Sequence, residues 1–192
     1  MNRAGLLRTG VGGGTALFGL GVWADRAAAA VPDVDISYLR LLVATELLKA
    51  DFANQAVAGG KLSVPAAAVV RHMHAADNAH YTGLAALMNE AGQPPATAGD
   101  IDFSYPRGSF ASARSTATLA WKLTSLALGA YLGALEQVQT PSIRLPLGQI
   151  AANEAQQQSA LAPLVGRRAI GSAFAAALPI DVVSAALDDY ES

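Results

Sequence analysis

Polar side chains interrupt the apolar stripes of three predicted helices in this 192-residue chain. Their helical spacing puts each of them on the same face as the neighbouring apolar residues, which is the face expected to point into the core. These residues are Glu46, Asp77, His80, Glu154 and Gln157. An ionised carboxylate on a core-facing position is costly unless it is paired, protonated or bound to a metal. Carboxylates with an imidazole are also ligands that iron, manganese and zinc accept. The residue types therefore predict a metal site built from several helices.

Helical rotation supports this placement, because residues spaced by three and four lie on one face. Glu46 follows Leu42 by four residues, and Asp77 follows Met73 by four. Glu154 lies four residues after Ile150 in the same way. Five other polar residues fall off these stripes or near helix ends, and we expect them to be solvated: Lys49, Asp51, Asn89, Glu90 and Arg168.

The composition favours one compact, Ala-rich helical domain. Hydrophobic residues make up 52% of the chain and the formal net charge is −2, so an electrostatic nucleic-acid interface is not expected. Cysteine is absent, which excludes a disulfide framework and a thiolate metal site. No apolar run reaches the ~18 residues expected of a membrane span.

Residues 1–30 have the pattern of an export signal and are set aside from the fold. Residues 1–8 hold two arginines and no acid, residues 11–24 are mildly apolar and Gly-rich, and residues 27–30 are small. The opening resembles a twin-arginine signal in which Ala4 stands where the second arginine should be. The alternative is a simple N-terminal extension. We expect an exported protein of the periplasm, cell envelope or extracellular space.

Hydrophobic period and Pro/Gly punctuation predict four long helices and a short one. Their approximate ranges are 35–58, 63–91, 109–138, 145–165 and 181–190. Short connections make the first two and the next two helices antiparallel neighbours.

The connection over residues 93–108 is long enough to cross the whole bundle, and Phe103 with Tyr105 is expected to hold it there. The predicted organisation is thus a bundle over residues 31–170 and a short C-terminal helix within residues 171–192.

These motifs resemble ferritin-like di-metal carboxylate proteins, in particular the small branch that includes desiccation-related proteins. That family takes one Glu from each of two helices and a Glu-x-x-His from each of the other two. Glu46 matches the first Glu, and Asp77-Asn78-Ala79-His80 matches the second motif with Asp in place of Glu. Tyr131-Leu132-Gly133-Ala134 resembles a third-helix motif, and Glu154-Ala155-Gln156-Gln157 matches the last motif with Gln in place of His. The resemblance implies an all-α, ferritin-like four-helix bundle with one long crossover between the second and third helices.

The third helix departs from the family pattern, because Thr124 or Ser125 stands where a carboxylate is expected. Glu136 cannot replace it, since five residues beyond Tyr131 it is rotated by ~140°. Three carboxylates and one imidazole predict a degenerate site for one iron, manganese or zinc ion, because two ions need more negative charge.

Two functions follow from the sequence. The first is an exported ferritin-like protein that binds one divalent ion and limits peroxide chemistry. The second is a metal-free bundle that acts as a stress-related structural or interaction module, in which Glu46 is a buried acid bonded to His80 or Tyr131. Catalytic activity and a homodimer both stay open.

Overall fold

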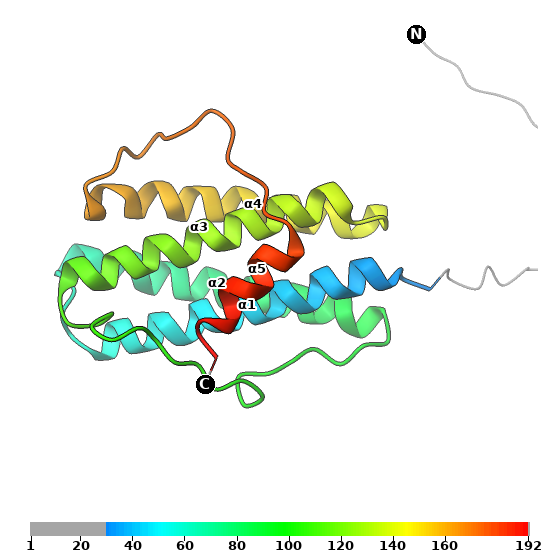
Figure 1. Ribbon diagram of the computed structural model, residues 1–192, viewed down its shortest axis with the longest axis horizontal. Coiled ribbons are helices and arrows are strands. Elements are labelled where there is room, and N and C mark those ends of the chain that lie inside the picture. Colours follow the sequence, from blue (N-terminus) through cyan, green and yellow to red (C-terminus); the bar gives the residue numbers. More distant parts are fainter. Residues whose placement is uncertain (1–29, 192) are drawn as a thin grey trace, which may run out of the picture.

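The computed structural model describes residues 30–191, which form a four-helix bundle with a fifth, short helix on its side (Figure 1). The bundle helices are α1 (Asp33–Ala58), α2 (Val64–Glu90), α3 (Ala113–Gln137) and α4 (Pro141–Leu161). A 3-10 turn, η1 (Ala162–Val165), extends α4, and α5 (Ile180–Asp188) follows a long loop. Apart from Ala30, the predicted export signal lies outside the described residues. None of the described helices has both the length and the hydropathy needed to cross a membrane.

Local signals explain where the helices begin. Ser112 and Ser115 form a reciprocal capping box, so α3 starts at residue 113 and not at the predicted residue 109. Helix α4 starts four residues earlier than predicted, because Pro141 is suited to the first turn of a helix. Pro146 lies inside this helix.

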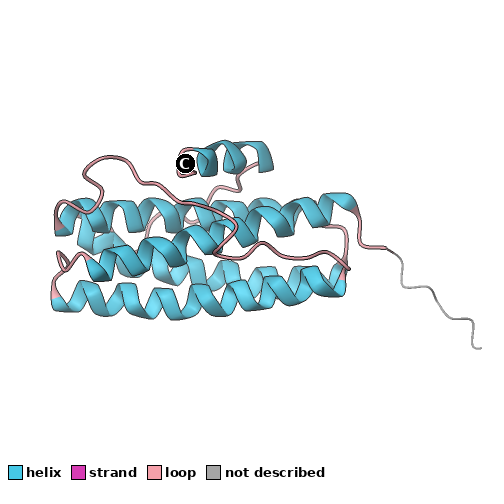
Figure 2. Cartoon of the chain, turned by 90° about the horizontal axis from the view of Figure 1, so that it is seen from below, coloured by secondary structure: helices cyan, strands magenta, loops and turns pink. Residues whose placement is uncertain are grey.

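The long connection between α2 and α3 runs the length of the bundle, as predicted, and joins two antiparallel helix pairs (Figures 1 and 2). The Tyr105 hydroxyl donates to Asp51 Oδ2 at 2.7 Å and to the Leu48 carbonyl oxygen at 3.2 Å. Phe103 packs partly buried against the core and forms an isolated antiparallel bridge with Glu191. These contacts confirm that the two aromatic residues hold the crossover on the bundle.

The C-terminal part of the chain packs directly on α1 and α3. Val183 and Leu187 of α5 are buried in the core. Just before α5, the Leu178 amide donates to the Gly129 carbonyl at 2.9 Å. A Cβ atom at Gly133 would collide with the Leu178 carbonyl oxygen, so this close approach requires a glycine.

Candidate metal centre

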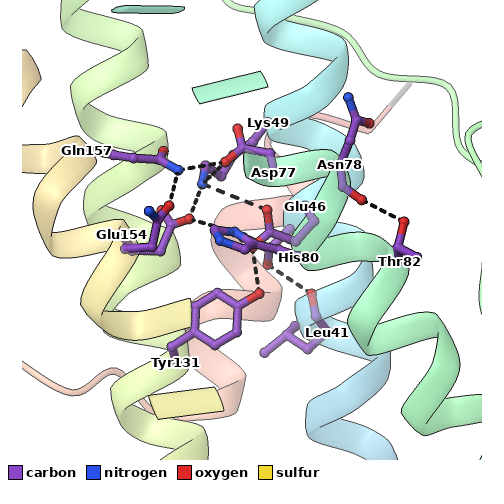
Figure 3. Close-up of polar contacts among 12 residues, drawn as sticks. Leu41, Glu46, Lys49, Asp77, Asn78, His80, Thr82, Tyr131, Glu154 and Gln157 are labelled. Atoms are coloured by element: carbon purple, nitrogen blue, oxygen red, sulfur yellow. Dashed lines mark hydrogen bonds and ion pairs between the residues drawn. The ribbon is translucent and has the colours of Figure 1, made fainter. Parts of the chain in front are cut away.

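Four side chains with metal-ligand atoms meet in the middle of the bundle (Figure 3). Glu46 comes from α1, Asp77 and His80 come from α2, and Glu154 comes from α4. One ligand-type atom from each lies within 4.8 Å of the others, and all four side chains are buried. The structure therefore brings together four of the five residues that the sequence proposed as ligands, in a group that could hold a metal ion.

Lys49 lies among these carboxylates, so the prediction that it is solvated is wrong. Its Nζ atom donates to Asp77 Oδ1 at 2.8 Å and to Glu154 Oε1 at 2.5 Å, and its side chain is only 3% exposed. The same atom lies 3.8 Å from Glu46 Oε2. A residue three positions after Glu46 is rotated by only ~60° from it, so helical spacing already contained the signal that Lys49 faces the same interior.

Gln157, the fifth predicted ligand, lies at the edge of the group. Its Nε2 atom donates to Asp77 Oδ1 and to Asn153 Oδ1, each at 3.0 Å. The side chain therefore presents its amide N–H groups to the carboxylates, while its Oε1 atom is buried without a hydrogen-bond partner. In this arrangement Gln157 orients Asp77 through a hydrogen bond to its carboxylate.

Helix α3 contributes a phenol to the group and no carboxylate. The Tyr131 hydroxyl donates to Glu46 Oε1 at 2.5 Å, and the Tyr131 side chain is fully buried. Burial, with the nearby charge of Glu46, raises the pKa of Tyr131 well above its ordinary value. Thr124 is buried on the same helix, and within residues 30–191 the metal-capable group includes no acid from α3.

His80 lies between two carboxylates. Its Nδ1 atom is 3.3 Å from Glu154 Oε1 and 3.5 Å from Glu46 Oε1, which are ion-pair distances and not well-formed hydrogen bonds. Burial alone would lower the pKa of His80, but the two carboxylates outweigh it and raise the pKa to about 9. At neutral pH the ring is therefore an imidazolium in the metal-free protein.

The other charged groups titrate according to their neighbours. Burial raises the pKa of Asp77 to about 6, with a further contribution from Glu46 and Glu154, and Lys49 opposes this increase. Burial also acts to raise the pKa of Glu46, but Lys49 and His80 hold it below its ordinary value. For Lys49, burial opposes the charged form, and the three surrounding carboxylates more than reverse that effect, so its pKa is raised. The ammonium is therefore the stable form of this side chain.

The donor set could hold a divalent metal ion. Three carboxylates face one ammonium and one imidazolium, so the group retains an excess of negative charge. Four of its buried atoms have no hydrogen-bond partner: Glu46 Oε2, Glu154 Oε2, Gln157 Oε1 and His80 Nδ1. Such unsatisfied atoms are costly in a protein interior and need an explanation. The three oxygens are of types that iron, manganese and zinc accept as ligands, and a nitrogen of His80 becomes one when the ring loses a proton.

The remaining histidines lie outside the group. His74 Nε2 is 3.1 Å from Asn78 Nδ2, within the same helix. His72 is exposed and lines a surface cavity of about 380 Å³ between α2 and α4. That cavity also contacts Met73 and Gln157, so it reaches the edge of the buried group.

Comparison with known proteins agrees with the architecture. A family model described as a ferritin-like domain matches residues 34–167, which span all four bundle helices and the crossover. No match was found among curated proteins. Because the match covers well over half of the sequence and the described chain is all-helical, the predicted fold is confirmed: this chain belongs to the ferritin-like domain family.

Proposed function

We propose that this chain is an exported ferritin-like protein whose buried centre binds one divalent metal ion. The observation that supports this proposal most directly is the convergence of Glu46, Asp77, His80 and Glu154 within 4.8 Å. Two carboxylates and one imidazole are a ligand set suited to Fe(II), Mn(II) or Zn(II), and a third carboxylate is present to complete it. The proposal of export depends on the residue pattern of positions 1–30.

Each surrounding residue has a role in this proposal. Asp77 and His80, one turn apart on α2, would hold the ion together with Glu46 and Glu154. Gln157 would fix the orientation of Asp77 through its Nε2 atom. When bound, an iron or manganese ion supplies redox chemistry and a zinc ion supplies a Lewis acid.

We propose ion binding and not di-metal oxidase activity. Two ions about 4 Å apart repel each other strongly, and bridging carboxylates must offset that repulsion. The phenol of Tyr131 keeps its proton and donates a hydrogen bond to Glu46, so α3 adds no negative charge to this group. The proposed role in stress is therefore to sequester a reactive ion and not to turn over a substrate.

The contacts of Lys49 favour a second candidate function. Its ammonium already bonds to two of the carboxylates, as a counter-ion that belongs to the chain. A bundle that needs no metal could then act as a structural or interaction module under stress. The two functions differ in one measurable property, which is the metal content of the folded protein.

The test compares metal content among matched variants of the full chain. Purified protein is loaded anaerobically with Mn(II) or Zn(II), desalted and analysed for bound metal. We expect about one ion per chain in the wild type and a loss of most of it in Glu46→Ala and His80→Ala. Glu136→Ala and His74→Ala are the matched controls, because both side chains lie outside the group and outside the lining of the cavity beside it. A wild-type protein that binds no ion would support the metal-free alternative.

A further inference from the structure

We propose that Lys49 competes with the metal ion for the same carboxylate oxygens, so that an ion is bound only when the ammonium withdraws. This inference depends on the proposed single-ion function and specifies what limits occupancy of that site. It assigns to Lys49 a regulatory position at the centre, where metal ligands alone would be expected.

The contacts of Lys49 Nζ show why the two cations exclude each other. The atom bonds to Asp77 Oδ1 and Glu154 Oε1, and the third carboxylate, Glu46, is 3.8 Å away. Those three residues supply all the negative charge of the group that could hold a metal. Two cations that share these oxygens would be only a few ångströms apart in a buried site, where water screens their repulsion poorly.

The same contacts leave a route for exchange. Lys49 bonds to only one oxygen of Glu154, and both Glu154 Oε2 and Glu46 Oε2 are buried without a hydrogen-bond partner. These two oxygens are available to an incoming ion before the ammonium moves. A lysine carries its charge on a flexible four-carbon chain, so Nζ can change position without a shift of helix α1.

Access to the group is consistent with this exchange. Gln157 lines the cavity between α2 and α4, and its Nε2 atom shares Asp77 Oδ1 with Lys49. Gln157 therefore separates this cavity from the carboxylate that both amide and ammonium contact. Lys49 thus sets a minimum affinity for metal binding, because only a cation that binds these carboxylate oxygens more strongly than the ammonium can replace it.

The experiment measures Zn(II) and Mn(II) binding to Lys49→Met by equilibrium dialysis of the full chain. Methionine has a similar length but no positive charge, so we expect binding to be at least roughly tenfold tighter than in the wild type. Lys61→Met is the control, because Lys61 is exposed, and its affinity should equal that of the wild type. Thermal melts with and without metal confirm that each variant is folded.

The outcomes separate the two proposals. If the wild type binds one ion and Lys49→Met binds no more tightly, the competition is overturned and the single-ion function stands. If the wild type binds none and Lys49→Met binds one, the competition stands and the wild-type metal function fails. If neither folded protein binds an ion, both are overturned.

A second measurement needs no variant at all. The chain has three lysines, so wild-type protein labelled with 15N at lysine gives three side-chain ammonium signals to follow by NMR. Zinc should move or remove the signal of Lys49 and leave those of the exposed Lys61 and Lys122 unchanged. An unchanged Lys49 signal in protein that has bound zinc would overturn the competition, even if Lys49→Met did not fold.

Discussion

Replacement of Lys49 by methionine should destabilise the metal-free protein by about 4 kcal/mol at neutral pH. The substitution removes two charge-assisted hydrogen bonds, to Asp77 and Glu154, which are worth roughly 1.5–3 kcal/mol each. It also leaves three buried carboxylates with only the His80 imidazolium to balance them. Protonation of Asp77 limits the loss. Its pKa is about 6 beside Lys49 and rises further without the ammonium, so protonation at pH 7 costs at most about 1.4 kcal/mol.

The assay is urea denaturation in the presence of a chelator, followed by far-ultraviolet circular dichroism. Lys122→Met is the control, because that lysine is exposed, and it should change the free energy of unfolding by less than about 0.5 kcal/mol. The double variant Lys49→Met, Glu154→Gln should lose about 2 kcal/mol less than the sum of the two single variants, because the residues interact directly. A loss below about 1 kcal/mol in Lys49→Met would refute the central position of the ammonium.

Three further predictions concern other parts of the chain. Asp35→Asn should lower the free energy of unfolding by about 2 kcal/mol in urea, because the buried Asp35 carboxylate accepts the backbone N–H groups of residues 139 and 140 at 2.8 Å each; an unchanged midpoint would contradict this. Gly133→Ala should detach the segment that precedes α5, seen as faster proteolysis near Leu178, whereas Gly148→Ala, which has open space for a methyl group, should not. The pKa of His80 rises from 6.5 when unfolded to about 9 when folded, so its contribution is complete below pH 6.5 and is lost as the pH rises through 9. In the presence of a chelator, the free energy of unfolding should therefore fall by roughly 2 kcal/mol between pH 6.5 and pH 9. His80→Gln should remove most of this pH dependence.

The sequence predicted the bundle well because its signals are local and repeated. Glu46, Asp77 and Glu154 are each embedded in apolar residues at helical spacing, and that spacing alone determines which way a side chain points. The crossover was predictable from its length, and its attachment was predictable from Tyr105. Helix starts were displaced by four residues where proline and serine allow two starting points.

Helical spacing put Lys49 on the same side of α1 as Glu46, but its burial was not predicted, since lysine is almost never buried unless it is paired. Its burial depends on acids that lie 28 and 105 residues further along the chain, and only the assembled bundle brings these together. Charge balance could have predicted the burial of Lys49. Three buried acids require cations nearby, and Lys49 is the basic residue one turn from Glu46. The contact of Leu178 with Gly133 was equally hidden, because no local pattern in a loop specifies what it packs against.

The packing of Leu178 against α3 has a practical consequence for the design of shortened versions of this chain. The family match ends at residue 167, and a truncated version cut there would lack Leu178, Val183 and Leu187. Removing them would uncover apolar surface on α1 and α3, and such freshly exposed patches promote aggregation. Expression trials should therefore retain the tail through Glu191, whose backbone pairs with Phe103 of the crossover.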